Sequence, residues 1–169
     1  MFGIFTIQLV LALVTLSLLA RWYVAPRLAG LPLESALQPL LAVHTLRYIG
    51  LVFLAPTVVH SGLTQAFALP AGLGTAIAGV LALASIAALR AGWSGAIPLV
   101  WIFSVEGLGD FANAFYQAGT HGANVVSNLG AAYYVPIVIV PAALITHVMI
   151  LGLLVQRLRA RAHAASVAQ

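Results

Sequence analysis

Hydrophobic residues along this chain gather in five long runs, separated by short stretches that contain charged, polar or proline residues. The runs cover residues 2–20, 36–55, 71–89, 96–117 and 130–155. Each is close to the roughly 20 residues that an α-helix needs to cross the hydrocarbon core of a bilayer. The pattern therefore predicts an all-α fold, a polytopic transmembrane bundle of five helices. We expect residues 1–157 to form this single domain and residues 158–169 to form a short basic, alanine-rich tail.

The composition supports a membrane environment. Hydrophobic residues make up 63% of the 169 residues and charged residues only 6%, whereas about a quarter of a soluble domain is charged. The expected surroundings of the protein are therefore a lipid bilayer. The first run has neither the basic start nor the small residues before a cleavage site that define a signal peptide, so we expect it to be retained as a helix.

The arginines that flank the runs predict the orientation of the bundle. They follow the first, third and fifth runs, at Arg21, Arg27, Arg90, Arg157, Arg159 and Arg161, and the linkers after the second and fourth runs contain no Arg or Lys. Cytoplasmic loops are enriched in basic residues, so we expect the N-terminus outside and the C-terminal tail in the cytoplasm of a bacterial inner membrane. The apolar linker 56–70 could lie in the interface or re-enter the membrane, and the pattern does not decide between them.

Two classes of site are not expected from this composition. The formal charge of +4 comes from arginines spread over membrane flanks, whereas nucleic-acid binding needs a clustered basic face. The chain contains no Cys, which excludes disulfides and sites that use thiolate ligands. Neither a nucleic-acid partner nor a cysteine-ligated metal is therefore expected.

Three charged residues lie inside the predicted spans, Arg47 in the second run and Glu106 and Asp110 in the fourth. Each costs about 2.5–3.5 kcal/mol at the centre of a bilayer, so such residues are functional candidates. Arg47 and Glu106 each lie about ten residues into their helices, near the midplane, and this predicts an ion pair between them. Asp110 and Asn113 continue the polar face of the same helix. One Arg cannot neutralise two carboxylates, so the surplus needs a proton, a cation or a charged His.

Histidines suggest a second kind of site. His44 in the second run and His147 in the fifth are expected at matching depth, where facing helices could hold a b-type haem or a divalent metal. His60 and His121, in the two external linkers, form a weaker pair of the same kind. The alternative for each histidine is a hydrogen bond within the bundle, without a ligand.

Three functions follow as hypotheses. The first is an intramembrane polar site, built from Arg47, Glu106, Asp110 and Asn113, that binds or conducts an ion, proton or small ligand. The second is a redox or metal-binding membrane protein that uses His44 and His147. The third is a membrane enzyme or accessory subunit acting on lipid, with His121 as a base beside Asp110 and Asn113. The short chain without internal repeats would need a homo-oligomer or a partner membrane subunit for transport. A polar network that only sets helix register is the alternative to all three.

Overall fold

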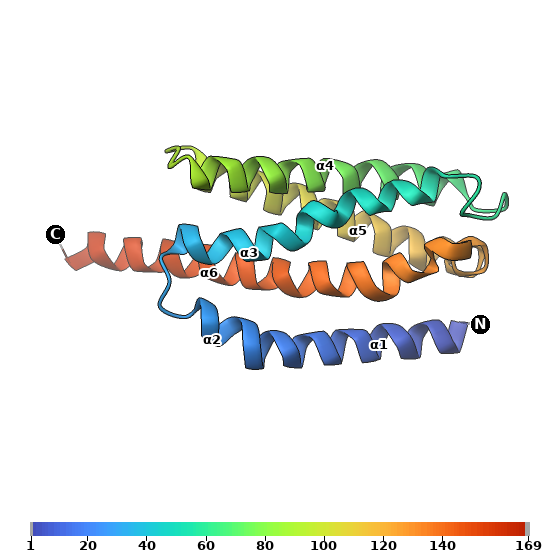
Figure 1. Ribbon diagram of the computed structural model, residues 1–169, viewed down its shortest axis with the longest axis horizontal. Coiled ribbons are helices and arrows are strands. Elements are labelled where there is room, and N and C mark those ends of the chain that lie inside the picture. Colours follow the sequence, from blue (N-terminus) through green and yellow to red (C-terminus); the bar gives the residue numbers. More distant parts are fainter. Residues whose placement is uncertain (1, 168–169) are drawn as a thin grey trace.

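The computed structural model describes residues 2–167 and is helical, with no β-strand in that range. Its elements in chain order (Figure 1) are α1 (Phe2–Leu19), a π-helical turn (Ala20–Val24), α2 (Ala25–Leu28), α3 (Leu33–Thr45), a 3-10 segment (Leu46–Leu54), α4 (Gln65–Arg90), α5 (Ala96–Asn128), a 3-10 turn (Gly130–Tyr133), a π-helical turn (Val135–Ile139) and α6 (Val140–Val167).

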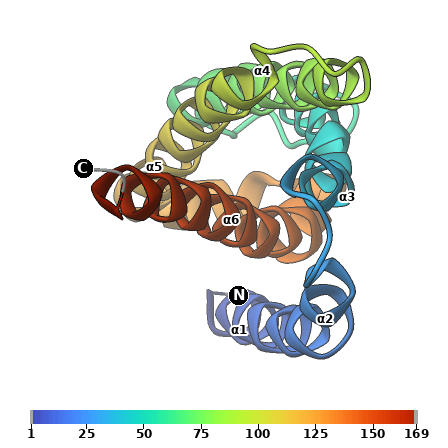
Figure 2. The ribbon, with the colours of Figure 1, turned by 90° about the vertical axis from the view of Figure 1, so that its left-hand side faces the viewer.

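Helices α3, α4, α5 and α6 surround a common core, and α1 lies outside them against α6 (Figure 2). The C-terminal ends of α2, α4 and α6 lie at one end of the molecule, which we call the arginine end because Arg27, Arg90 and Arg157 belong to it. The start of α1 and the turns of residues 55–64 lie at the opposite end, which we call the loop end. The predicted grouping of the flanking arginines at one end of the bundle is therefore present.

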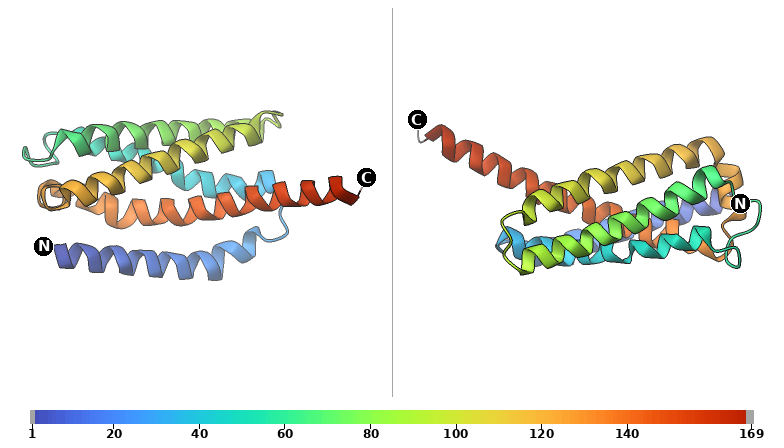
Figure 3. Two further views of the ribbon diagram at one scale, coloured as in Figure 1. Left: turned by 180° about the vertical axis from the view of Figure 1, so that it is seen from behind. Right: turned by 90° about the horizontal axis from the view of Figure 1, so that it is seen from above.

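Four helical stretches are long and apolar enough to cross a membrane, which indicates that the protein associates with membranes. They are Gly3–Leu28, Leu33–Leu54, Gln65–Arg90 and Gly130–Ser166. The fourth predicted span is helical as well, within α5, but polar side chains such as Glu106, Asp110 and Asn113 lower its hydropathy. The C-terminal part of α6 extends beyond the neighbouring helices (Figure 3), so the predicted basic tail continues this helix to Val167.

The prediction that a linker begins after residue 117 was wrong, because α5 continues to Asn128 with a kink at His121. Gly119, Gly122 and nearby polar residues resemble a loop in sequence. The extra turns instead hold the loop-end turns in place. The Asn124 side chain accepts from Thr64 N–H at 3.0 Å and donates to the Gly62 carbonyl at 2.9 Å. The predicted linker 56–70 is correspondingly shorter, since α4 begins at Gln65.

The second predicted helix changes its winding at residue 46, and this change directs Arg47 inward. The 3-10 segment runs for nine residues, although such runs seldom exceed about four. Side chains three apart share a face in this winding, and every third position from Leu41 to Phe53 is buried: Leu41, His44, Arg47, Gly50 and Phe53. A regular α-helix would turn that series progressively away from the core.

Glycines allow this segment to cross α4 at short range. A Cβ atom at Gly50 would lie 2.9 Å from Thr75 Cβ on α4. A Cβ atom at Gly79 of α4 would lie 3.4 Å from the Thr45 carbonyl oxygen. The missing side chains therefore set the distance between the 3-10 segment and α4.

This crossing predicts that Gly50→Ala destabilises the protein. The new methyl group would overlap the Thr75 side chain, and overpacking of this kind costs about 1–3 kcal/mol. The measurement is thermal unfolding of the protein in mild detergent. Thr75→Ala should recover part of the loss in the double variant.

Gly152→Ala on α6 is the matched control for this experiment. A Cβ atom there meets nothing within 4 Å, so the substitution should keep or slightly raise stability through helix propensity. Equal destabilisation by both substitutions would contradict the close crossing.

Candidate functional site

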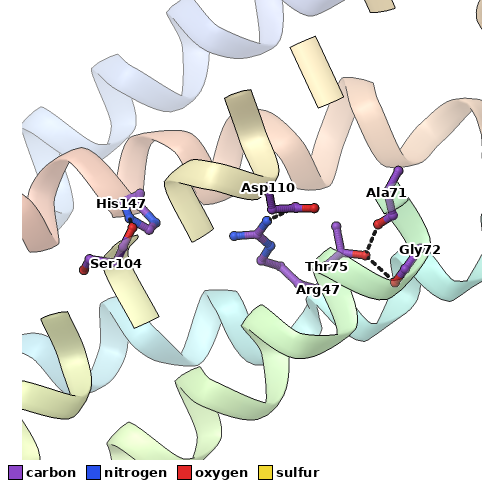
Figure 4. Close-up of polar contacts among 7 residues, drawn as sticks. All are labelled: Arg47, Ala71, Gly72, Thr75, Ser104, Asp110 and His147. Carbon is purple, nitrogen blue, oxygen red and sulfur yellow. Dashed lines mark hydrogen bonds and ion pairs between the residues drawn. The ribbon is translucent and has the colours of Figure 1, made fainter. Parts of the chain in front are cut away.

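Arg47 and Asp110 form a buried ion pair at the centre of the bundle (Figure 4). Nη2 of Arg47 donates to Oδ2 of Asp110, and the two side chains are only 2% and 4% exposed. The pair joins the 3-10 segment to α5. In an interior shielded from water such a charge-assisted hydrogen bond is far stronger than on a surface.

The prediction that Arg47 pairs with Glu106 was wrong, because Arg47 pairs with Asp110 instead. Asp110 lies one helical turn closer to the loop end than Glu106, and the long arginine side chain reaches it. Gly74 of α4 makes room for the carboxylate, since a Cβ atom there would overlap Asp110 Oδ1. Glu106 remains within electrostatic range of both Arg47 and Asp110. Its Oε2 atom is buried and has no hydrogen-bond partner among the described residues.

The guanidinium of Arg47 has two further neighbours. Its Cζ atom lies 4.3 Å from the centroid of the Phe111 ring, in a cation–π contact. Its Nη1 atom lies beside Gly107, where a Cβ atom would come within 3.1 Å. Nη1 is buried without a hydrogen-bond partner in the described part of the chain. The absence of a side chain at position 107 thus provides the space for this cation between the helices.

His44 and His147 lie side by side, and both rings are buried next to Arg47. Their centroids lie 5.2 Å apart with the rings edge to face. His147 Nε2 donates to the Ser104 carbonyl of α5 at 3.1 Å (Figure 4). His44 Nε2 lies 3.1 Å from Oγ1 of Thr146, whose hydroxyl donates to the Ala142 carbonyl at 2.9 Å, so His44 is the donor. Each histidine therefore connects two helices.

This arrangement does not fit a b-type haem between His44 and His147. In such a site both ligating nitrogens face one iron from opposite sides of a flat macrocycle. Here the two rings pack directly edge to face, and both Nε2 atoms are used in hydrogen bonds. Across residues 2–167 no group of three or more His, Asp or Glu side chains is placed to hold a metal ion.

The outer residues of the predicted sites lie apart from the buried pair. Asn113 is half-buried on the same face of α5 as Asp110, whereas His60 and His121 are exposed. His121 Nδ1 lies 2.8 Å from the hydroxyl of its neighbour Thr120. Eleven residues of helix, about 16 Å at 1.5 Å per residue, separate His121 from Asp110. The predicted grouping of His121 as a base with Asp110 is therefore absent.

An apolar cavity of about 160 Å³ extends from Asp110 toward the loop end. Leu9 of α1 and several small residues line it, together with phenylalanines from four elements. These phenylalanines are Phe5, Phe53, Phe67, Phe111 and Phe115. Sequence reasoning did not identify these phenylalanines, because they are indistinguishable by type from lipid-facing or core residues. Of the predicted polar face of α5, Asp110 lines this cavity and Asn113 does not.

A continuous apolar core fills the half of the bundle that lies toward the arginine end, which we call the arginine half; the other half is the loop half. Its buried members come from all four inner helices and include Leu37, Leu41, Ala82, Val100, Phe103, Ile150 and Leu154. Among the described residues of this cluster none is charged. The buried polar groups therefore connect to the cavity on the loop side and adjoin a packed hydrophobic layer on the other.

Comparison with known proteins places this arrangement in a family. Residues 4–155 match the model of the family described as Domain of unknown function (DUF8737). No curated protein and no solved structure matches the chain. The matched segment contains α1 from Ile4 onward, the buried pair and the residues that line the cavity.

The buried pair predicts a large difference between two arginine substitutions. Arg47→Ala leaves Asp110 buried without its partner, which costs about 3–5 kcal/mol. Arg90→Ala removes an exposed charge and should change stability by less than about 0.5 kcal/mol. Thermal unfolding and expression level in detergent extracts measure both. Similar behaviour of the two variants would contradict the buried pair.

Replacing both partners of the ion pair separates the effect of the lost charges on stability from the effect of lost packing. Arg47→Met combined with Asp110→Leu should be clearly more stable than Arg47→Ala, because apolar residues of similar volume can substitute for a buried ion pair.

Proposed function

The chain belongs to the family Domain of unknown function (DUF8737), and we propose that it is an integral membrane protein that binds a small, largely apolar molecule between its helices. The observation that supports this most directly is the cavity that ends on Asp110, the ion-pair partner of Arg47. An apolar pocket with a few convergent polar groups is the usual form of a small-molecule site.

The size of the cavity supports a ligand of about one aromatic ring. A cavity of about 150 Å³ lined by apolar side chains is known to bind benzene, and this cavity measures about 160 Å³. Its inner end differs from such a case in offering a carboxylate, which can orient a ligand through a hydrogen bond.

Binding is a better proposal than conduction across the membrane. A conduction path needs polar groups or water along its whole length. The apolar layer around Leu41, Phe103 and Ile150 closes the arginine half, whereas the polar groups and cavity occupy the loop half. The proposed site therefore lies in one half of the bundle only.

The proposed membrane placement has five spans, with the N-terminus outside and the C-terminus in the cytoplasm of a bacterial inner membrane. The span that this placement adds to the four apolar stretches is α5, whose Asp110 is directed to the interior of the bundle instead of to lipid. The common location of Arg27, Arg90 and Arg157 at one end supports the orientation through the enrichment of basic residues in cytoplasmic loops.

The placement predicts the accessibility of single cysteines, which the chain lacks naturally. Ser127→Cys, near the C-terminal end of α5, should react with a membrane-impermeant maleimide on intact cells. Ser94→Cys, in the turn before α5, should react only after lysis. Both serines are exposed. Labelling of both positions from the same side would show that α5 does not span, and the reversed pattern would refute the orientation.

Filling the cavity should remove ligand binding. We expect fluorobenzene to show saturable binding to the protein in nanodiscs, measured by ¹⁹F NMR against empty nanodiscs. Ala114→Phe places a ring in the cavity and should weaken this binding at least about tenfold. Ala84→Phe, at an exposed position of α4, is the matched control and should bind as the unmodified protein does.

Two results would contradict the proposed function. One is the absence of saturable fluorobenzene binding to the folded, unmodified protein. The other is equal binding by Ala114→Phe and Ala84→Phe, which would locate the probe outside the cavity.

A further inference from the structure

The cavity has a definite electrostatic character that narrows the class of ligand. Among the described residues that line it, Asp110 is the only ionisable one. Thr75 also lines the cavity, but its hydroxyl donates to carbonyls of its own helix, including that of Ala71 at 2.6 Å. A ligand in the cavity therefore meets a carboxylate as the principal polar group.

Asp110 keeps hydrogen-bonding capacity after pairing with Arg47. A carboxylate has two oxygens with about four acceptor positions, and Arg47 occupies one of them through Nη2. Arg47 itself is not among the lining residues. The group presented to a ligand is thus an acceptor, which selects for N–H or O–H donors.

The charge balance around the pair favours a positive ligand. Arg47 is the single cation of the cluster, and Asp110 and Glu106 are both within its electrostatic range. When both carboxylates are ionised the cluster has one negative charge in excess. In a site shielded from water an unbalanced charge is costly, and a cation in the cavity would balance it.

The aromatic lining favours a positive ligand as well. Five phenylalanine rings surround the cavity, and the face of an aromatic ring attracts cations through its quadrupole. One of these rings, Phe111, already contacts the Arg47 guanidinium at 4.3 Å. Aromatic rings combined with one carboxylate form the kind of cage that recognises ammonium groups.

We propose that the cavity binds a small organic cation, an ammonium group attached to a ring or alkyl body of about the size of benzene, with its ammonium at Asp110. This inference rests on the proposed function, because it names the ligand class of the same cavity. An organic anion would meet the Asp110 carboxylate unfavourably. A neutral alcohol could donate a hydrogen bond to Asp110 but would not balance the negative charge that is in excess when both carboxylates are ionised.

A series of three one-ring compounds with different charge tests the proposal. Benzylammonium, benzyl alcohol and benzoate are similar in size, and each competes with fluorobenzene for the protein in nanodiscs. We expect benzylammonium to displace fluorobenzene at least about tenfold more effectively than benzyl alcohol. Benzoate should be the weakest. Equal displacement by the cation and the alcohol, or strongest displacement by benzoate, would overturn the proposal.

Variants identify the group responsible for the preference. Asp110→Asn keeps the shape of the side chain and should abolish the preference for benzylammonium over benzyl alcohol. Glu34→Gln, an exposed carboxyl at the arginine end, is the control and should keep the preference. If Asp110→Asn does not fold, Phe115→Leu is the second variant, because it removes a lining ring without altering the ion pair. It should reduce the preference by about threefold or more; an unchanged preference would overturn the aromatic part of the argument.

The outcomes separate this inference from the proposed function. If fluorobenzene binds and is displaced without regard to charge, the cavity binds small molecules and the cation proposal is wrong. If fluorobenzene shows no saturable binding to the folded protein, the proposed function fails, and the cation proposal, which rests on it, fails with it.

Discussion

The interior of this protein is organised around one buried ion pair, between Arg47 and Asp110. Moving these charges from water into the bundle is costly, and their mutual contact offsets the cost only when the geometry is good. The surrounding sequence provides that geometry through residues that lack side chains. Gly74 leaves space for the carboxylate and Gly107 leaves space for the guanidinium. The 3-10 winding of residues 46–54 turns the arginine inward.

The pair also separates two halves of the bundle with different physical character. Toward the arginine end the inner helices meet in a continuous apolar core. Toward the loop end they diverge around a cavity, and α1 closes part of its side through Phe5 and Leu9. Near that closure Tyr133 donates to Gln8 of α1 at 2.5 Å. The helix that packs outside the bundle therefore forms part of the cavity wall.

The two buried histidines have a structural role in this arrangement. His147 links α6 to α5 through the Ser104 carbonyl, and His44 links α3 to α6 through Thr146. A buried polar group that lacks a partner is costly, so these hydrogen bonds restrict how the helices can rotate. Phe103 packs against both rings, at 4.9 and 5.2 Å between centroids. The histidines thus form a boundary layer between the ion pair and the apolar core.

The sequence by itself determined that the protein is helical, that several helices suit a membrane, and which polar residues lie at its centre. Hydropathy and helical period report these features because they depend on residue type and spacing along one helix. Only the tertiary structure decided that Arg47 pairs with Asp110 instead of Glu106, that α5 continues past His121, and that five phenylalanines form one cavity. These outcomes depend on how the helices wind, rotate and approach one another. A local pattern contains no information about the distance between residues on different helices.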